Sequence, residues 1–167
     1  MSEWTTYLSV VDDAGGWIDS ANAIDNSTGT SSLIGGSIDR TLSLSHPVAA
    51  SESGIITKVE MRMYGYENAT TPYIKMYFIP TFISGVGTSR EVNWYSPAWG
   101  SWYDVTADPN APGTWTWAEV EGIGANILHD YVFGTPVGVS YCASVEIRVT
   151  YEEVSTVAKP YPGRLLL

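Results

Sequence analysis

Residues 143–152 read Ala-Ser-Val-Glu-Ile-Arg-Val-Thr-Tyr-Glu and carry the strongest structural pattern in this chain of 167 residues. Every second residue is apolar and the residues between are polar or charged. The apolar positions are Val145, Ile147, Val149 and Tyr151. A period of two predicts a β-strand with one buried side and one solvent-facing side. A shift of register by a single residue would expose the whole apolar side, so we expect the register to be strongly specified.

A second strand is predicted for residues 55–66, where Val59, Met61 and Met63 alternate with charged residues. These charged residues are Lys58, Glu60 and Arg62. The polar side of this strand therefore carries both signs of charge, as does the polar side of residues 143–152. Opposite charges on adjacent strands stabilise cross-strand pairs, and the two faces are suited to such pairing.

Shorter segments of strand character, separated by turns, occur through the rest of the chain. They cover residues 4–11, 33–48, 73–83, 91–95, 99–105 and 131–140. Thr116 and Glu119 have the spacing of a capping box, which predicts a short helix from Trp117 to about Gly122. About eight strands with turn signals between them favour an all-β, antiparallel β-sandwich of the jelly-roll type. We expect residues 1–154 to form this domain and residues 155–167 an extended C-terminal tail.

The charge and cysteine content exclude several classes of function. A net charge of −10, with only 8 Lys and Arg residues, argues against binding to nucleic acid or to an anionic membrane surface. Cys142 is the single cysteine, so no internal disulfide can form, and we expect its thiol to be buried. The sequence shows neither a Sec-type signal peptide nor a membrane-spanning segment, which predicts synthesis in the cytosol.

No catalytic motif is found, so we expect no enzyme. The acidic segment after the first predicted strand offers candidate metal ligands. They are Asp12, Asp13 and Asp25. Calcium takes several oxygen ligands and is the cofactor that such a segment suggests, although the spacing does not match the helix–loop–helix calcium loop. The alternative is that these aspartates form turns and helix caps.

Aromatic residues are concentrated between residues 94 and 103. Candidate glycan contacts are Trp94, Trp99 and Trp102, because exposed rings can stack on sugars. The alternatives are that these rings pack in the core and at sheet edges, or that they form the centre of a protein interface. A glycan-processing enzyme is a further alternative, for which the sequence offers only carboxylates with no defined setting.

The C-terminal tail is predicted to be an interface, because it is extended and ends in three leucines that need a covering surface. The predicted interface residues are Pro160, Pro162, Arg164, Leu165, Leu166 and Leu167. Either the tail folds back on its own domain or it docks on another subunit.

Several segments resemble a family of jelly-roll proteins encoded by tailed phages and related viruses. They are residues 17–23 with Asp25-Asn26, residues 59–64, 99–103, 115–117, 133–134 and 145–151. The chain departs from the family pattern at Thr135-Pro136, where the family continues its strand. The resemblance implies a non-catalytic virion component, such as a capsid decoration, head-fibre or tail protein. It also implies a homo-oligomer such as a trimer, contact with a major capsid or tail protein, and location in the virion after synthesis in the host cytoplasm. A carbohydrate-binding module remains the alternative.

Overall fold

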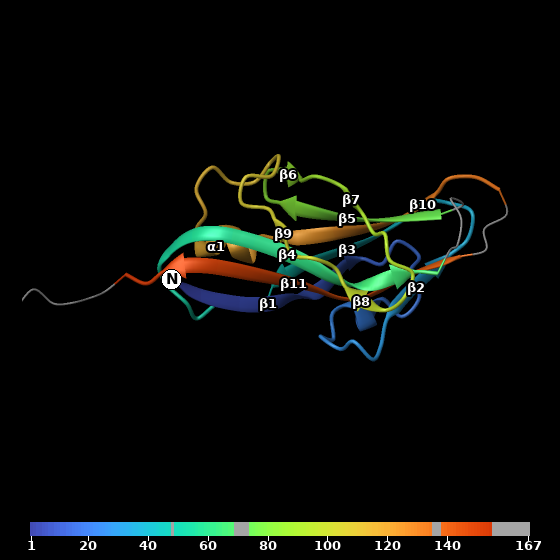
Figure 1. Ribbon diagram of the computed structural model, residues 1–167, viewed down its shortest axis with the longest axis horizontal. Helices are drawn as coiled ribbons and strands as arrows, with labels where there is room; N and C mark the ends of the chain where they lie inside the picture. The colour runs from blue at the N-terminus through green and yellow to red at the C-terminus, as the bar shows by residue number, and fades with distance from the viewer. Residues whose placement is uncertain (48, 69–73, 135–137, 155–167) are drawn as a thin grey trace, which may run out of the picture.

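A computed structural model describes residues 1–47, 49–68, 74–134 and 138–154 of the chain. Two antiparallel sheets form a sandwich, with a 3₁₀ turn η1 and a short helix α1 at its edges (Figure 1). The strands are β1 (Ser2–Asp13), β2 (Ser32–Gly35), β3 (Arg40–Pro47), β4 (Ile55–Glu67), β5 (Ile74–Phe82), β6 (Gly85–Val86), β7 (Arg90–Glu91), β8 (Ala98–Trp99), β9 (Tyr103–Asp104), β10 (Gly124–Tyr131) and β11 (Val139–Glu152). The helical segments are η1 (Ser20–Ala23) and α1 (Trp117–Glu121). The predicted all-β sandwich is confirmed, with more strands than predicted.

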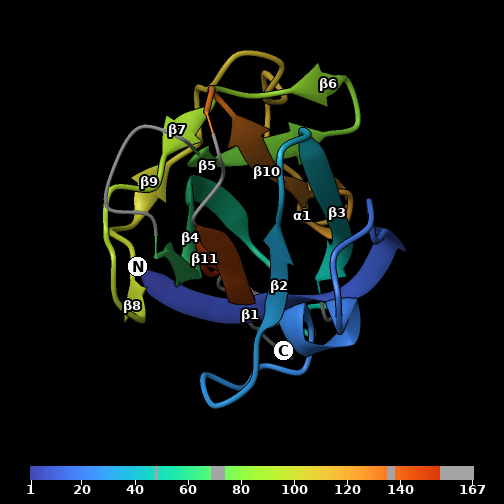
Figure 2. The same ribbon diagram turned by 90° about the vertical axis from the view of Figure 1, so that its right-hand side faces the viewer.

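The two sheets share strand β1. Its first half, residues 2–7, pairs with β11 in sheet A. In the same sheet, β11 also pairs with β4 and β2, and β4 pairs with β8 and β9. Its second half, residues 8–13, pairs with β3 in sheet B, which continues through β10 and β5 to β6 and β7. Figure 2 shows β1 running along one side of the sandwich, where it joins the two sheets.

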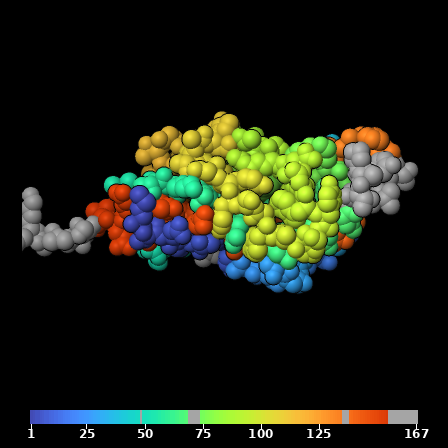
Figure 3. Space-filling view, in the orientation of Figure 1, coloured from blue at the N-terminus to red at the C-terminus, as the bar shows by residue number. Residues whose placement is uncertain are grey.

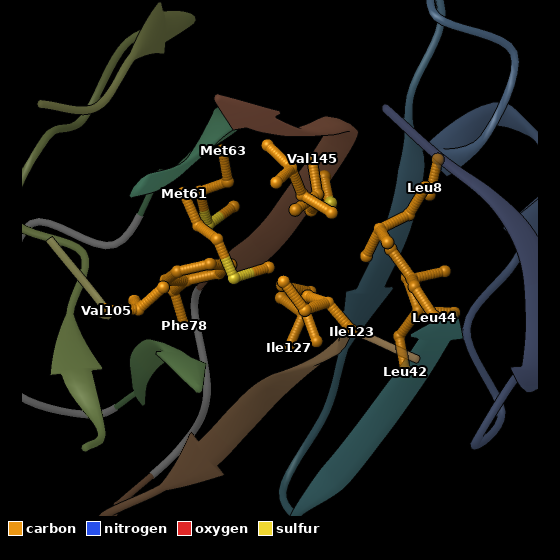
Figure 4. Close-up of a cluster of buried hydrophobic side chains, with 14 of the residues drawn as sticks. Leu8, Leu42, Leu44, Met61, Met63, Phe78, Val105, Ile123, Ile127 and Val145 are labelled. Carbon is orange, nitrogen blue, oxygen red and sulfur yellow. The ribbon is translucent and has the colours of Figure 1, made fainter. Parts of the chain in front are cut away.

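The core lies between the sheets and confirms the inward side predicted for β11. Val145, Ile147 and Val149 are fully buried and Tyr151 is 4% exposed. Met61 and Met63 of β4 also point inward, toward residues of sheet B that include Phe78 and Ile127 (Figure 4). Each such large apolar side chain contributes roughly 1.5–3 kcal/mol by its removal from water.

Two strand predictions require correction because the predicted segment is interrupted. The predicted strand over residues 33–48 is two strands, β2 in sheet A and β3 in sheet B, separated by a turn that includes Gly36 at φ 122°. The predicted strand over residues 99–105 is likewise divided into β8 and β9. In between, the Gly100 N–H donates to the Met63 carbonyl. Of the strand predicted at residues 91–95, only Glu91 lies in a strand.

The strand predicted over residues 131–140 is wrong. The chain instead forms β10, which ends at Tyr131, and β11, which begins at Val139. Gly134 has φ 85°, a left-handed conformation that a continuous strand does not contain. Residues 135–137 lie outside the described residues.

The polar side of β11 differs from the prediction at Ser144, which is only 1% exposed. The register of β11 against β4 shifts between Cys142 and Ser144, and η1 contacts this strand. A bulge of this kind interrupts the regular alternation of the two sides.

The helix prediction is confirmed. The Thr116 hydroxyl accepts a hydrogen bond from the Glu119 N–H at 3.2 Å, and the helix ends before Gly122. Among the residues that the structure describes, no helix has the length and apolar content needed to cross a bilayer.

Candidate functional site

The candidate site is a pocket of about 180 Å³ on the outer face of sheet A. Tyr64, Gly65 and Tyr66 of β4 and Tyr141 of β11 line it together with Ala143. Residues 28–31 and Pro97 complete the lining. The segment around residue 25 (blue) and the segment near residue 97 (yellow-green) come together on the surface of the molecule (Figure 3). The volume is below the roughly 300–1,000 Å³ typical of sites for drug-sized ligands, so it suits a single ring-sized group.

Three tyrosine rings give the pocket its aromatic character. Tyr66 and Tyr141 lie opposite each other on β4 and β11 and stack with a centroid distance of 4.3 Å and an interplanar angle of 6°. Burial, and secondarily the neighbouring Tyr141, raise the pKa of the Tyr66 phenol above its ordinary value. The Tyr66 hydroxyl therefore stays protonated at neutral pH and can both donate and accept a hydrogen bond.

Gly65 allows β4 and β11 to approach closely beneath these rings. A Cβ atom at this position would overlap the Tyr141 carbonyl oxygen. The close approach of the two strands at this point holds Tyr66 and Tyr141 side by side.

Asp25 shapes the loop that forms one wall of the pocket. One carboxylate oxygen accepts from the Ser27 N–H at 2.8 Å, and the other accepts from the Thr30 hydroxyl at 2.6 Å. The Asn22 amide donates to the Ser31 carbonyl at 3.3 Å. Asp25 thus acts as a turn former, the alternative considered for the acidic segment.

The other two candidate metal ligands also make local hydrogen bonds. Asp12 accepts from the Ser45 hydroxyl and Asp13 accepts from the Gly15 N–H, both at 2.8 Å. Within the described ranges, no group of three or more His, Cys, Asp or Glu side chains is arranged to hold a metal ion. All three aspartates bond to backbone N–H or hydroxyl groups, and the calcium site stays a prediction without a geometry to support it.

Next to the pocket, the outer face of β4 and β11 carries a ladder of ion pairs, as the sequence suggested. Arg62 pairs with Glu146 at 2.7 Å and Arg148 with Glu60 at 2.8 Å, and Lys58 also contacts Glu60 at 2.7 Å. Arg62 lies directly opposite Glu146, and Arg148 opposite Glu60, in the strand register. The pKa of the Glu60 carboxyl is lowered: burial alone would raise it, but the two cations that bond to it outweigh burial.

Trp99 and Trp102 cover this ladder. The Arg62 guanidinium lies 4.2 Å from the centroid of Trp99 and 4.3 Å from that of Trp102, and Arg148 lies 4.4 Å from that of Trp102. Trp99 also meets Tyr64 edge-on, with the centroids 5.3 Å apart. Trp99 therefore connects the pocket to the ion-pair ladder, and both tryptophans are partly exposed.

Trp94, the third candidate glycan contact, has a structural role. Its indole N–H donates to the Gly65 carbonyl at 2.6 Å, and its ring packs against the core. Trp94 was predicted together with Trp99 and Trp102 because the three residues are close in the sequence. In the structure, Trp94 packs against the core, whereas Trp99 and Trp102 cover the ion pairs.

Sequence reasoning missed the three tyrosines of the pocket. Tyr64 and Tyr66 continue the outward positions of β4 occupied by Lys58, Glu60 and Arg62, so the strand period could have placed them on the same face. The sequence contains no comparable signal for the bulge in β11 or for the position of residues 28–31 in the wall of the pocket.

Cys142 is fully buried, as expected from the sequence. Burial raises the pKa of its thiol to about 12, so it is not a nucleophile at neutral pH. The predicted interface of the C-terminal tail lies outside the described residues. Its members are Pro160, Pro162, Arg164, Leu165, Leu166 and Leu167.

No protein-family model and no curated protein matches the chain. Among solved structures, the chain is similar to the CBM36-1 domain of a multidomain xylanase from the hindgut metagenome of Trinervitermes trinervoides, known from a crystal structure. The alignment covers 92% of this chain and 100% of that domain, with 10% identity and a TM-score of 0.42. A likeness at this level carries no information about ligand or function.

Proposed function

We propose that this domain is a non-catalytic binding module that takes one ring of a neutral carbohydrate in the pocket floored by Tyr64, Tyr66 and Tyr141. The observation that carries the proposal is the chemistry of the lining. Among the described residues that line the pocket, none is Asp, Glu, Lys, Arg or His, and the lining combines aromatic rings with hydroxyl-bearing residues.

This combination suits a sugar better than other ring-sized ligands. A sugar ring presents C–H groups on its faces and hydroxyls around its edge, so it needs aromatic surface together with hydrogen-bonding groups. The tyrosines supply rings with a polar tip. Thr28, Thr30 and Ser31 add hydroxyl groups that both donate and accept. A phosphate or a carboxylate ligand would instead call for Arg or Lys in the lining.

Substitution of Tyr66 tests the proposal. Tyr66→Ala removes the ring that stacks on Tyr141, and we expect glycan binding to fall at least about tenfold, the equivalent of about 1.4 kcal/mol. Binding is measured on a glycan array and then by calorimetry with the best saccharide. The matched control is Tyr95→Ala, because Tyr95 is 62% exposed and does not line the pocket. Absence of binding to every glycan by the wild-type domain would refute the proposal.

The role in a virus particle is a second candidate, supported by an apolar end of sheet A. Met1, Ile55 and Val154 are 89%, 63% and 64% exposed. They lie at the start of β1, at the start of β4 and just after β11, where these three strands end side by side. Exposed apolar side chains at one end fit a contact with a neighbouring subunit or a capsid or tail protein. A protein can hold such a contact and also bind a glycan at a separate pocket.

Removal of the tail separates this second candidate from the first. A variant lacking residues 157–167 should keep the fold, because β11 ends at Glu152, and should lose oligomerisation and attachment to particles. The measurement is molar mass in solution by light scattering, together with co-sedimentation with isolated particles. A truncated chain that assembles and attaches like the full chain would contradict the docking role of the tail.

A further inference from the structure

We infer that the ligand is a neutral oligosaccharide chain, which continues from the tyrosine pocket across Trp99 and Trp102 along the outer face of sheet A. This inference rests on the proposed function, since it extends the same site. Under this inference, the pocket binds the first sugar ring and Trp102 contacts the second and later rings.

A continuous row of side chains leads out of the pocket. Tyr64, which lines the pocket, meets Trp99 edge-on at 5.3 Å. Trp99 and Trp102 are joined by the Arg62 guanidinium, which lies within 4.3 Å of both ring centroids. Arg148 extends the row from β11. The pocket and Trp102 therefore belong to one surface.

The tryptophans are held in place by contacts with two arginines. Arg62 and Arg148 extend from adjacent strands of the sheet, and both contact the Trp102 ring. Both guanidinium groups hold the Trp102 ring, which stays partly exposed to solvent. Arg62 is itself fixed by hydrogen bonds from Nε and Nη2 to Glu146, at 2.8 and 2.7 Å. A ring that is already ordered loses little conformational entropy when a ligand binds.

The charges of this surface favour a neutral chain. Arg62, Arg148 and Lys58 each contact a glutamate oxygen at 2.8 Å or less. An acidic sugar would have to compete with Glu60 or Glu146 for these cations, and it would also meet the overall charge of −10. A neutral sugar meets neither obstacle, and its hydroxyls can bond to the free lone pairs and N–H groups of the ion pairs.

The surface extends beyond the pocket. The pocket has a volume of about 180 Å³, which suits one ring, and Trp102 is not among the residues that line it. A ligand that uses both the pocket and Trp102 therefore needs more than one ring.

The test compares saccharides of increasing length. The probes are the monosaccharides glucose, mannose and N-acetylglucosamine with their linear oligomers, and an oligogalacturonate as the acidic counterpart. For the series that binds, we expect wild-type affinity to rise at least about tenfold from monomer to the longer oligomers. Trp102→Ala should remove most of that rise while leaving the monosaccharide affinity unchanged. Trp102→Phe keeps a ring over the two guanidinium groups and should retain most of the rise.

Each result has a defined meaning. An affinity that is independent of length, an equal loss for monomer and oligomers in Trp102→Ala, or tighter binding of the oligogalacturonate would each overturn this inference. Because the monosaccharide affinity reports on the pocket alone, the first two outcomes leave the proposed function standing. Tighter binding of the oligogalacturonate would also contradict the neutral ligand proposed for the pocket. Failure of every probe to bind the wild-type domain would remove the inference and the proposed function together.

Discussion

Ile147→Asp should leave the domain unfolded at room temperature. Ile147 is fully buried and lies opposite Met61 of β4 and Thr6 of β1, at the centre of sheet A. An aspartate there would place an unpaired carboxylate among apolar side chains and would also remove the apolar contacts of the isoleucine. A buried, uncompensated charge of this kind costs more than about 4 kcal/mol, a large part of the roughly 5–15 kcal/mol that stabilises a typical domain.

The control for this substitution introduces the same residue on the other side of the sheet. Thr5→Asp places an aspartate at an exposed position of β1 directly opposite Arg148, and the unfolding free energy should change by no more than about 0.5 kcal/mol. Circular dichroism and urea unfolding of the two variants give the comparison. An Ile147→Asp domain with the stability of the wild type would show that the buried side of β11 is assigned wrongly.

Glu67→Gln should make the domain more stable at alkaline pH. Glu67 is 5% exposed at the end of β4, and its carboxyl oxygen accepts a hydrogen bond from the Met76 N–H of β5 at 3.0 Å. It therefore links sheet A to sheet B. Burial, and secondarily the charge of Glu91, raise the pKa of Glu67 to about 7, although the Met76 hydrogen bond and Lys75 act in the opposite direction.

The sign of the effect follows from this raised pKa. The unfolded chain loses the Glu67 proton near its ordinary pKa of 4.5, whereas the folded domain keeps it until about pH 7. Between these values the folded state binds more protons, so the unfolding free energy falls as the pH rises. The loss is complete above the folded pKa and amounts to about 1–3 kcal/mol.

A glutamine accepts the Met76 hydrogen bond and carries no charge. The unfolding free energy of the variant should therefore not fall in this way as the pH rises. We expect the stability of Glu67→Gln relative to wild type to increase by about 1–3 kcal/mol from about pH 5 to about pH 8. Urea unfolding across that range measures it. Glu121→Gln, at an exposed position at the end of α1, should retain the pH dependence of the wild type. Parallel pH profiles for Glu67→Gln and wild type would contradict a buried, protonated Glu67.

The parts of the fold that could be predicted are those in which one strand stays in one sheet. β11 and β4 bury one side along their whole length, so Val145, Ile147, Met61 and their neighbours alternate clearly with charged residues. The same alternation placed Arg62 and Glu146 on faces suited to pairing, and the structure joins them.

The sequence did not predict strand β10, because this strand has a polar residue at a buried position. β10 points Ala125, Ile127 and His129 inward, and a buried histidine conceals the alternation. His129 is accommodated because its ring nitrogens lie within hydrogen-bonding distance of the Ser140 hydroxyl and the Gly36 carbonyl. Those partners lie on other segments of the chain, so only the folded arrangement reveals them.

The pocket could not be predicted for a related reason. Tyr66 and Tyr141 are far apart in the chain and meet only through the register of β4 and β11, which includes a bulge. Of the tryptophans proposed as glycan contacts, Trp99 and Trp102 adjoin the pocket through Tyr64 and Arg62, whereas Trp94 supports the core. The three tryptophans are close in the sequence, but the fold packs Trp94 against the core and places Trp99 and Trp102 beside the pocket.

The most direct test of the central claim is to locate the bound saccharide by NMR, with the best-binding glycan from the array titrated into labelled protein. We expect the largest amide shifts at the residues lining the pocket, Tyr64, Gly65, Tyr66 and Tyr141, and in residues 28–31. Shifts confined to another surface, or no shifts at saturating saccharide, would contradict a sugar site in this pocket.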